Sequence, residues 1–394
     1  MRILYVQYTN PGAYPPLVRG ARLLADAGAE IRMLGVRVAG LDALDVESDD
    51  RMDVRLMPAG AKAWQLKAHY ARYAAWAAAE GAKWRPDWIY ASDVLAAPVA
   101  VALATLTGAR VVYHEHDAPS LEHQSWAYRR CLSARRRLLH QARVVVTPNA
   151  QRSAHLSAVA GGRAVLTVWN CPPRPHSPTP RPPHEAGLRA IYRGSVNADR
   201  LPETVVDAIA LTPDASLDIV GYETAGSRGH IDQLLARAAV LGVSDRVRSL
   251  GAMGPRALDA VCGRADIGLA LMPMDSRDEN MRHMTGASNK VFEYFACGVA
   301  PLVSALDEWR TTFVDAGYAL ACDPRSAESI AAAFGLALRD RDELAAIAAR
   351  GWQRLQIDWN YETQFAPVME ALWSARGSVP AAVAHAGREA QCVS

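Results

Sequence analysis

A lysine and a glutamate lie three positions apart in residues 287–304, ASNKVFEYFACGVAPLVS, a segment that is otherwise mostly apolar. At 3.6 residues per turn, a helix over this segment has two distinct faces. The apolar face holds Val291, Phe292 and Phe295, and the opposite face holds Lys290, Glu293, Tyr294 and Cys297. We therefore predict a helix that ends at Gly298 and keeps both charges on the face away from the core.

The first turn of such a helix carries unpaired backbone N–H groups and a partial positive charge, which suit a diphosphate. Lys290 adds a full positive charge there, and Glu293 can accept hydrogen bonds from ribose hydroxyls. The alternative is a solvated ion pair between the two residues, worth ~0.2–0.5 kcal/mol. Only four of the 43 basic residues are lysines, which weakly favours a function for this one.

Short β-branched runs alternate with Ala- and Leu-rich helical patterns, which predicts parallel sheets covered on both faces. The predicted strands are 2–7, 30–36, 88–92, 109–117, 142–149, 164–170, 189–194, 216–222, 246–251, 266–273 and 300–304. The predicted helices are 15–29, 64–84, 94–108, 128–143, 203–211, 231–242, 255–265, 290–298, 325–350 and 351–376. The fold class is therefore α/β, with two Rossmann-like domains in tandem.

A proline-rich stretch divides the chain, with seven prolines among residues 171–187. No helix or central strand tolerates that density, so we predict an extended linker between residues 1–170 and residues 188–355. A C-terminal helix over 356–376 is expected to return to the N-terminal domain, and 377–394 to be a disordered tail. Two such domains are expected to form a cleft at the carboxyl ends of their strands, where ligands bind.

Bulk composition excludes several classes of function. The net charge of +2 is too small to indicate nucleic-acid binding. No apolar run is long enough to span a bilayer, and the N-terminus starts with a strand pattern instead of a secretion signal. The six cysteines have no metal-ligand spacing and fit reduced thiols, so we expect a cytoplasmic enzyme.

The segment KVFEYFACGVAPLVS resembles a characteristic element of retaining glycosyltransferases of family 4, which have the GT-B fold. Other matching pieces follow in the family's order across residues 1–375. They are the YPP loop, HEHD, TPN, NCP, YRGSVNADRLPETVVDAI, VGYE, LGAMGPRALDAVCGRADIGLALMP and WNYETQFAPVMEAL. The resemblance implies a nucleotide-diphosphate sugar as the donor substrate, with UDP favoured over GDP, and no cofactor.

The resemblance also implies which residues hold the donor. Glu293 matches the glutamate that binds the ribose, and Lys290 matches a lysine near the donor diphosphate. Gly194 matches the glycine of the first loop in the second domain, and Arg200 the cation that grips the diphosphate. The implied donor-binding residues are thus Gly194, Arg200, Met253, Ser288, Asn289, Lys290 and Glu293, with Met253 beside the base.

Two positions depart from the family pattern. Many members carry a second cation where this chain has Ser195, and a first acidic residue where it has Thr285. The missing acid leaves the contact to the donor's sugar hydroxyls open. Glu279 lies upstream and is interpreted as a loop charge, and Arg193 is not assigned to the site.

HEHD, residues 114–117, follows a strand at its carboxyl end, and the resemblance makes His116 and Asp117 the catalytic pair that faces the donor sugar. A metal site and a structural pair are the alternatives. Alternation along an extended chain separates His114 and His116 from Glu115 and Asp117, which argues against a shared metal. Gly12 and Tyr14, in the loop after the first strand, are assigned to the acceptor side.

Metal-independent transfer with retention is the mechanism that the resemblance implies. The only D-x-D pattern, Asp340-Arg-Asp342, is better explained as a helix start than as the metal site of a GT-A enzyme. Cationic groups would then stabilise the leaving diphosphate. Since no carboxylate is placed as a nucleophile, we favour front-side attack by the acceptor hydroxyl.

The acceptor is expected to be a small molecule or a lipid-linked glycan in glycan or secondary-metabolite biosynthesis. Aromatics on helix 64–84 (Trp64, Tyr70, Tyr73 and Trp76) and arginines on helix 128–143 (Arg129, Arg130, Arg135, Arg136 and Arg137) suit a membrane surface. The alternative is core packing of the aromatics and solvation of the arginines.

Three other functions compete with transfer. They are a sugar-nucleotide epimerase of the same fold, a catalytically silent partner subunit, and a nicotinamide dehydrogenase. The dehydrogenase is disfavoured because NPGAYPP follows the first strand in place of G-x-G-x-x-G.

Overall fold

The computed structural model describes residues 1–37, 46, 48–60, 66–119, 125–175, 187–224 and 226–375. The chain divides into two compact units. Unit 1 holds Met1–Pro173 and the chain from Tyr361 onward, and unit 2 holds Arg174–Asn360. The predicted tail at 377–394 and most of the proline-rich stretch lie outside the described residues.

Unit 1 is built on a seven-stranded sheet with the order β3-β2-β1-β4-β5-β6-β7, in which every pairing is parallel. Its strands are β1 (Arg2–Val6), β2 (Glu30–Val36), β3 (Met52–Met57), β4 (Trp88–Ser92), β5 (Arg110–His114), β6 (Val144–Thr147) and β7 (Leu166–Thr167). Its helices are α1 (Pro15–Asp26), α2 (Leu66–Trp84), α3 (Asp93–Thr107), α4 (Trp126–Gln141), α5 (Ala150–Val159) and α14 (Tyr361–Ser374). The central strands are buried on both faces, as their continuous apolar runs require.

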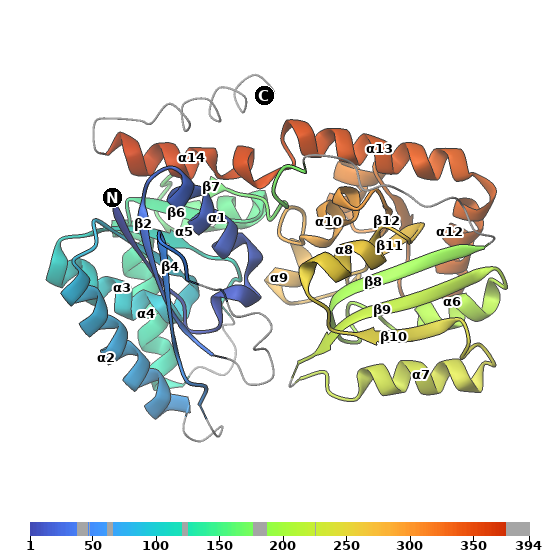
Figure 1. Ribbon diagram of the computed structural model, residues 1–394, viewed down its shortest axis with the longest axis horizontal. Helices are drawn as coiled ribbons and strands as arrows, with labels where there is room; N and C mark the ends of the chain where they lie inside the picture. Colours follow the sequence, from blue (N-terminus) through green and yellow to red (C-terminus); the bar gives the residue numbers. More distant parts are fainter. Residues whose placement is uncertain are drawn as a thin grey trace. The chain divides into compact units, whose positions relative to one another are not determined.

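The last helix belongs to the unit that contains the N-terminus. In Figure 1 the red α14 lies beside the blue α1 and the green β7. Its Phe365 and Leu372 are fully buried in the core of unit 1. The Phe365 ring packs on Gly20 of α1, where a Cβ would lie 3.0 Å from the ring.

Unit 2 has a six-stranded sheet with the order β10-β9-β8-β11-β12-β13, again parallel throughout. Its strands are β8 (Leu188–Val196), β9 (Ala215–Glu223), β10 (Val247–Gly251), β11 (Ile267–Ala270), β12 (Ala300–Ser304) and β13 (Leu320–Cys322). Its helices are α6 (Thr204–Leu211), α7 (His230–Val240), α8 (Pro255–Cys262), α9 (Glu279–Arg282), α10 (Lys290–Ala296), α11 (Asp307–Trp309), α12 (Ala327–Arg339) and α13 (Arg341–Ile357). The prediction of two parallel-sheet α/β units is confirmed.

The strand order reverses at β1 in unit 1 and at β8 in unit 2, because each has its sequence neighbour on one side and a later strand on the other. Crevices outside the carboxyl ends of strands at such reversal points are where doubly wound sheets bind ligands. The loops that follow β1, β4 and β5 in unit 1, and β8 in unit 2, are therefore the ones that position the candidate site.

Several predicted boundaries were wrong. The strand predicted at 164–170 is only β7, and β3 and β13 were not predicted at all. Both missed strands lie at sheet edges and are short or half-exposed, so they lack the long apolar run of a central strand. The two helices predicted over 325–376 are three, α12, α13 and α14.

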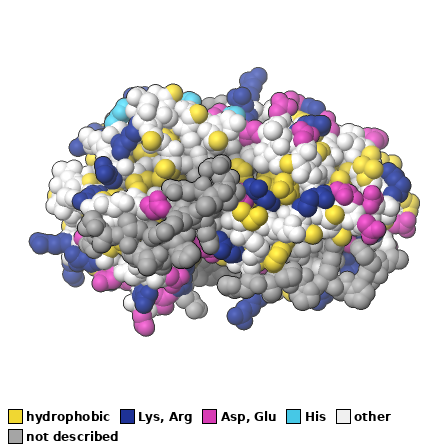
Figure 2. All heavy atoms as spheres, turned by 90° about the horizontal axis from the view of Figure 1, so that it is seen from above, with side chains coloured by type: hydrophobic (Ala, Val, Ile, Leu, Met, Phe, Trp, Pro, Cys, Tyr) yellow, Lys and Arg dark blue, Asp and Glu magenta, His cyan; other side chains and the backbone are white. Residues whose placement is uncertain are grey.

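No helix in the described ranges is both long enough and apolar enough to cross a bilayer. On the face shown in Figure 2, basic and acidic side chains intermingle and apolar side chains form small patches. The helix start predicted at Asp340-Arg-Asp342 is confirmed, because Asp340 caps α13 and accepts a hydrogen bond from the Glu343 amide at 2.9 Å.

Gly351 was predicted to begin a new helix, and instead it lies in the middle of α13. A Cβ at this position would lie 2.1 Å from the Phe295 ring on α10, so the glycine permits close packing of the two helices. We expect Gly351→Ala to lower the free energy of unfolding by about 1–3 kcal/mol, because the added methyl group overpacks this contact. Urea denaturation measures the change.

Gly226 is the matched control, because a Cβ there meets nothing within 4 Å. Gly226→Ala should change the unfolding free energy by less than ~0.5 kcal/mol. Equal stability of the two variants would contradict the packing role given to Gly351.

Candidate functional site

Helix α10 is buried on both of its faces, which corrects the predicted two-faced arrangement. Tyr294, predicted on the polar face, is fully buried with its ring over Gly268 of β11, and its hydroxyl donates to the Leu269 carbonyl at 3.0 Å. Cys297 is also buried. The helix packs against β11 and β12 as well as α13, so the side opposite Phe295 is not solvent.

Lys290 is only 6% exposed, so the alternative of a solvated ion pair is wrong. Its Nζ lies 5.1 Å from the centre of the Tyr192 ring, in a cation–π contact. It also lies against Gly194, where a Cβ would be 2.8 Å from Nζ. Gly194 has φ +109°, so the backbone conformation favours glycine at this position, and a larger residue would also displace the lysine Nζ.

Arg200 is held beside Lys290 by the loop that follows β8. Its Nη1 donates to Ser195 Oγ at 3.0 Å, and its backbone amide donates to the Asn197 side chain at 3.0 Å. Ser195, which replaces a second cation of the family pattern, thus orients the first one. Burial and the charge of Arg200 lower the pKa of Lys290 to about 7.

Glu293 is held at both carboxylate oxygens. Arg193 Nη2 lies 3.2 Å from Oε2, and Asn289 Nδ2 donates to Oε1 at 2.8 Å. Arg193 is 9% exposed and was not assigned to the site from the sequence. The signal in the sequence that could have identified Arg193 was its position on a central strand, because a buried charge requires a partner.

We call Arg193, Arg200, Lys290 and Glu293 the Lys290 cluster. It contains three basic side chains and one carboxylate, and the nearby Asp259 is largely exposed at 3.5 Å from Arg193. The cluster therefore carries excess positive charge in a place of low solvation, which favours a polyanion.

Two of the other predicted donor residues directly precede Lys290 in the chain. Ser288 is buried beside α10 and Asn289 is the N-cap of that helix. Met253 lies in the loop between β10 and α8, and within the described ranges it forms no hydrogen bond or ion pair with the Lys290 cluster. Thr285 is buried, and Glu279, interpreted from the sequence as a loop charge, instead begins α9, with its Oε1 3.7 Å from His283 Nε2.

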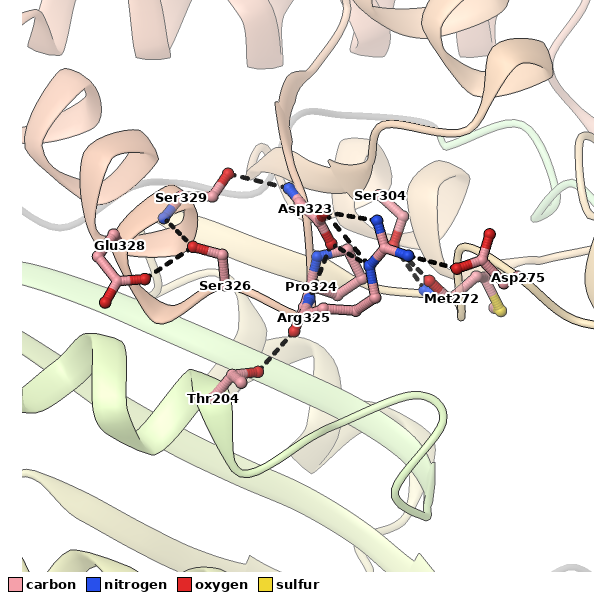
Figure 3. Close-up of polar contacts among 10 residues, drawn as sticks. All are labelled: Thr204, Met272, Asp275, Ser304, Asp323, Pro324, Arg325, Ser326, Glu328 and Ser329. Atoms are coloured by element: carbon pink, nitrogen blue, oxygen red, sulfur yellow. Dashed lines mark hydrogen bonds and ion pairs between the residues drawn. The ribbon is translucent and has the colours of Figure 1, made fainter.

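The loop that leads to α10 is anchored at its start by the ends of two strands (Figure 3). Ser304, at the end of β12, accepts from the Met272 amide at 2.8 Å and donates to the Met272 carbonyl at 2.7 Å. Arg325 binds Asp323 through two donors and also pairs with Asp275 of the loop. These contacts fix the direction in which the chain leaves β11 towards Ser288.

In unit 1 the HEHD segment begins with His114, the last residue of β5, and its two histidines lie apart from Glu115 as predicted. The rings of His114 and His116 stack with centres 3.7 Å apart, and a hydrogen bond of 2.6 Å joins His114 Nδ1 to the Tyr90 hydroxyl. Glu115 lies on the other side, where Arg135 donates to it at 2.5 and 2.8 Å. Glu115 is therefore structural.

His116 is neutral at physiological pH, because burial, assisted by Arg152, lowers its pKa to about 3. It is 5% exposed, and neither ring nitrogen has a hydrogen-bond partner in the part of the chain that the structure describes. Buried polar atoms are rarely left without a partner. The ring is thus poised to bind a polar ligand or water.

Asp93 is a site residue that the sequence reasoning missed. It follows β4 with φ +63°, which is uncommon for a residue other than glycine. Its Oδ1 accepts from the backbone amides of His116 at 2.8 Å and Asp117 at 3.2 Å. Burial, together with the charge of Asp117, raises the pKa of Asp93 well above its usual value. The only signal for Asp93 in the sequence was the position of an aspartate at the end of a strand, which the structure places next to β1.

The loop after β1 reaches the same histidine. Asn10 caps the turn Pro11–Ala13 by accepting from the Gly12 amide at 2.9 Å. The Tyr14 ring lies 5.7 Å from that of His116. The structure thus brings Tyr14 together with His116, whereas Gly12 serves the turn.

The predicted aromatic and basic surface is only partly present. Tyr73 is fully buried, and the Tyr70 hydroxyl donates to the Leu95 carbonyl, so these aromatics of α2 pack inwards. Trp64 lies outside the described residues. On α4, Arg135 pairs with Glu115, and the exposed arginines are Arg129, Arg130, Arg136 and Arg137.

The lowered pKa of Lys290 has a measurable effect on stability. The folded protein binds this proton less tightly than the unfolded chain, whose lysine pKa is ~10.4. The resulting penalty is complete below about pH 7 and disappears as the pH rises towards 10. We expect Lys290→Met to stabilise the protein by on the order of 2–4 kcal/mol at pH 6.5, with a smaller gain at pH 9.5.

Urea denaturation across this pH range tests the expectation. Lys83→Met, at an exposed lysine, should show no such pH dependence. A gain from Lys290→Met that is constant with pH would contradict the lowered pKa.

Two family models match consecutive parts of the chain. A glycosyl transferase 4-like domain covers residues 17–194, and a glycosyl transferase-like domain covers residues 202–370. A glycogen synthase of Mycobacterium tuberculosis (strain H37Rv) is 25% identical over 398 residues, which cover 92% of each chain.

Solved structures support the same fold. Anabaena Alr3699/HepE in complex with UDP and glucose superposes with a TM-score of 0.72 at 18% identity, covering 95% of this chain and 100% of that one. Sucrose-phosphate synthase from Thermosynechococcus elongatus gives a TM-score of 0.74 at 17% identity with the same coverage. The chain therefore carries two glycosyltransferase domains, the first of them family 4-like, with the GT-B fold.

Proposed function

We propose that this protein transfers a sugar from a nucleotide-diphosphate donor, with UDP preferred over GDP, to an acceptor hydroxyl. The observation that carries the proposal is the excess positive charge of the Lys290 cluster. A diphosphate would supply the missing negative charge, and Glu293, held by Arg193 and Asn289, would present its remaining lone pairs to the ribose hydroxyls. Support comes from the Anabaena neighbour, which was solved with UDP and with UDP-glucose.

In this proposal the protein's own cations stabilise the leaving group, so the reaction is metal-independent. Lys290, which lies over Tyr192, and Arg200, which Ser195 orients, would face the phosphate oxygens on which negative charge develops as the bond to the sugar breaks. Removing one such group costs about 2.7–4 kcal/mol in comparable sites. The proton on Lys290 matters here, because a neutral amine gives no such stabilisation.

We further propose retention at the anomeric carbon by front-side attack. The acceptor oxygen forms the new bond to that carbon while the bond to the phosphate oxygen breaks, and the departing phosphate takes the hydroxyl proton. Neutral His116, with Asp117 beside it, would contact the transferred sugar. Its imidazole can donate from one nitrogen and accept at the other.

The acceptor in this proposal is a small molecule or a lipid-linked glycan of glycan or secondary-metabolite biosynthesis, reached in the cytoplasm or at its membrane face. The exposed arginines of α4 support contact with an anionic membrane. The inward packing of Tyr70 and Tyr73 counts against the larger aromatic surface.

Calorimetric titration with UDP, GDP, ADP and dTDP, without added metal, tests the donor site. We expect UDP to bind most tightly and Lys290→Ala to weaken binding by about 10- to 100-fold, because a charge-assisted contact is lost. Lys83→Ala is the control, because this lysine is exposed and lies in unit 1. If no nucleotide binds with or without metal, the silent-partner function, suggested by Ser195 and Thr285, replaces transfer.

The stereochemistry of the product tests the mechanism. With an α-linked donor sugar, proton NMR of the first product formed should show the small anomeric coupling of an α-linkage. A β-linked product, or a trapped glycosyl-enzyme, would refute front-side retention. Turnover of the donor sugar without any acceptor to an isomeric sugar would indicate the epimerase.

A further inference from the structure

A basic groove lies at the end of the unit 1 sheet where β5 begins, and His116 lies beyond the other end of that strand. It has a volume of about 850 Å³, and its floor is formed by the buried side chains of Ala109, Val111 and Leu138. Arg110 starts β5 and His116 follows the end of that strand. Arg110 and His116 are six positions apart along the chain, or roughly 20 Å at ~3.3 Å per residue if extended.

The ionisable side chains that line the groove are all basic. Four arginines and one histidine line it, and no aspartate or glutamate does so among the described residues. These side chains are Arg110, Arg137, His140, Arg143 and Arg163. Such a concentration of positive charge over an apolar floor is unfavourable unless an anion or solvent screens it.

Two of the arginines are accounted for by contacts within the fold. Arg163 donates to the His140 carbonyl at 2.7 Å and also binds the Ala142 carbonyl, so it caps the C-terminus of α4. Arg137 donates to Gln141 at 2.8 Å. Both interactions belong to the end of one helix.

Arg110 and Arg143 have no such explanation. Both are exposed, and over the described ranges neither guanidinium has a hydrogen-bond or ion-pair partner. Arg110 Cζ lies 5.6 Å from the centre of the Trp88 ring, and the residue also lines the groove. A helix C-terminus attracts a cation by ~0.3–1 kcal/mol, and Arg110 and Arg143 follow the ends of α3 and α4. This attraction favours their positive charge there, but it does not pair the N–H donors of either guanidinium.

We propose that this groove binds a phosphate ester or diphosphate group, separately from the nucleotide-sugar site. The planar, five-donor guanidinium matches phosphate oxygens in pairs, and Arg110 and Arg143 offer two such groups with donors to spare. The volume is in the range of small-molecule sites, and the apolar floor accommodates the uncharged part of the ligand. A soluble organic phosphate and a phospholipid headgroup both offer this chemistry.

Calorimetric titration with inorganic pyrophosphate tests the groove, and it is done on the full chain carrying Lys290→Ala so that the donor site contributes little. We expect one binding event, weakened at least tenfold by Arg110→Ala/Arg143→Ala. The matched control is Arg129→Ala/Arg130→Ala, which removes the same charge from exposed α4 positions outside the groove. The control should change the affinity by less than about threefold at 0.15 M salt, where distant charges are screened.

Three results would overturn the proposal. The first is the absence of pyrophosphate binding in the Lys290→Ala background, and the second is equal weakening by the control pair. The third is unchanged affinity in Arg110→Ala/Arg143→Ala, with urea denaturation confirming that the variant is folded. The nucleotide titration is independent of these results, so failure of the donor site and failure of the groove are distinguishable.

Sedimentation with vesicles of phosphatidylglycerol and phosphatidylcholine (1:3) separates the two sources of phosphate. If the groove takes a lipid headgroup, Arg110→Ala/Arg143→Ala abolishes sedimentation and pyrophosphate competes with it. If it takes a soluble phosphate, pyrophosphate and glucose 6-phosphate bind as expected while the wild-type protein stays in the supernatant. A third outcome would count against the groove as a phosphate site. In that case only Arg129→Ala/Arg130→Ala reduces sedimentation, and Arg110→Ala/Arg143→Ala leaves pyrophosphate binding unchanged.

Discussion

The burial of one lysine beside one glycine is the constraint around which the candidate site of unit 2 is arranged. Lys290 Nζ lies over the Tyr192 ring and beside Gly194, where a Cβ would be 2.8 Å from Nζ and where the backbone adopts φ +109°. That conformation in turn brings the Gly194 carbonyl onto β9, where a Cβ at Gly221 would lie 1.9 Å from the oxygen. Two glycines on neighbouring strands are therefore linked to the position of a single ammonium group.

The burial of Lys290 lowers the folding stability of the protein when no ligand is bound. Burial lowers the pKa of Lys290 to about 7, so near neutral pH the folded state holds this proton weakly. Arg193 is neutralised by Glu293, whereas the Arg200 guanidinium bonds to the neutral Ser195 hydroxyl. Buried charges that lower the stability of the free protein are typical of binding sites, because a ligand of opposite charge compensates them.

The patterns of the sequence predict most of the fold. Continuous apolar runs identify β4 and β12, and Gly108 and Gly298 end their helices with positive φ as expected. The exceptions have physical reasons. Edge strands such as β3 lack the apolar run, and Gly351 is a packing glycine inside α13 that sequence alone does not distinguish from a helix stop.

For the candidate site, the sequence identifies Lys290 and Glu293 but not their supporting residues. Arg193 and Asp93 act through contacts between segments far apart in the chain, and no spacing rule connects Arg193 to Glu293 across 100 positions. The burial of Lys290 was also unpredictable, because periodicity gives the faces of a helix without saying what covers each one. Tertiary packing decides that.

The two units differ in the kind of ligand chemistry that they offer. Unit 2 presents charge, with three basic side chains around one carboxylate, and it suits a group that keeps or gains negative charge during a reaction. Unit 1 presents a neutral imidazole, because burial holds His116 uncharged, and Asp93 fixes its backbone through a strained turn. A neutral imidazole, which can donate one hydrogen bond and accept another, suits sugar hydroxyls, because their charge changes little during a reaction. The proposed division between phosphate recognition in unit 2 and sugar recognition in unit 1 would therefore follow from how each unit solvates its polar side chains.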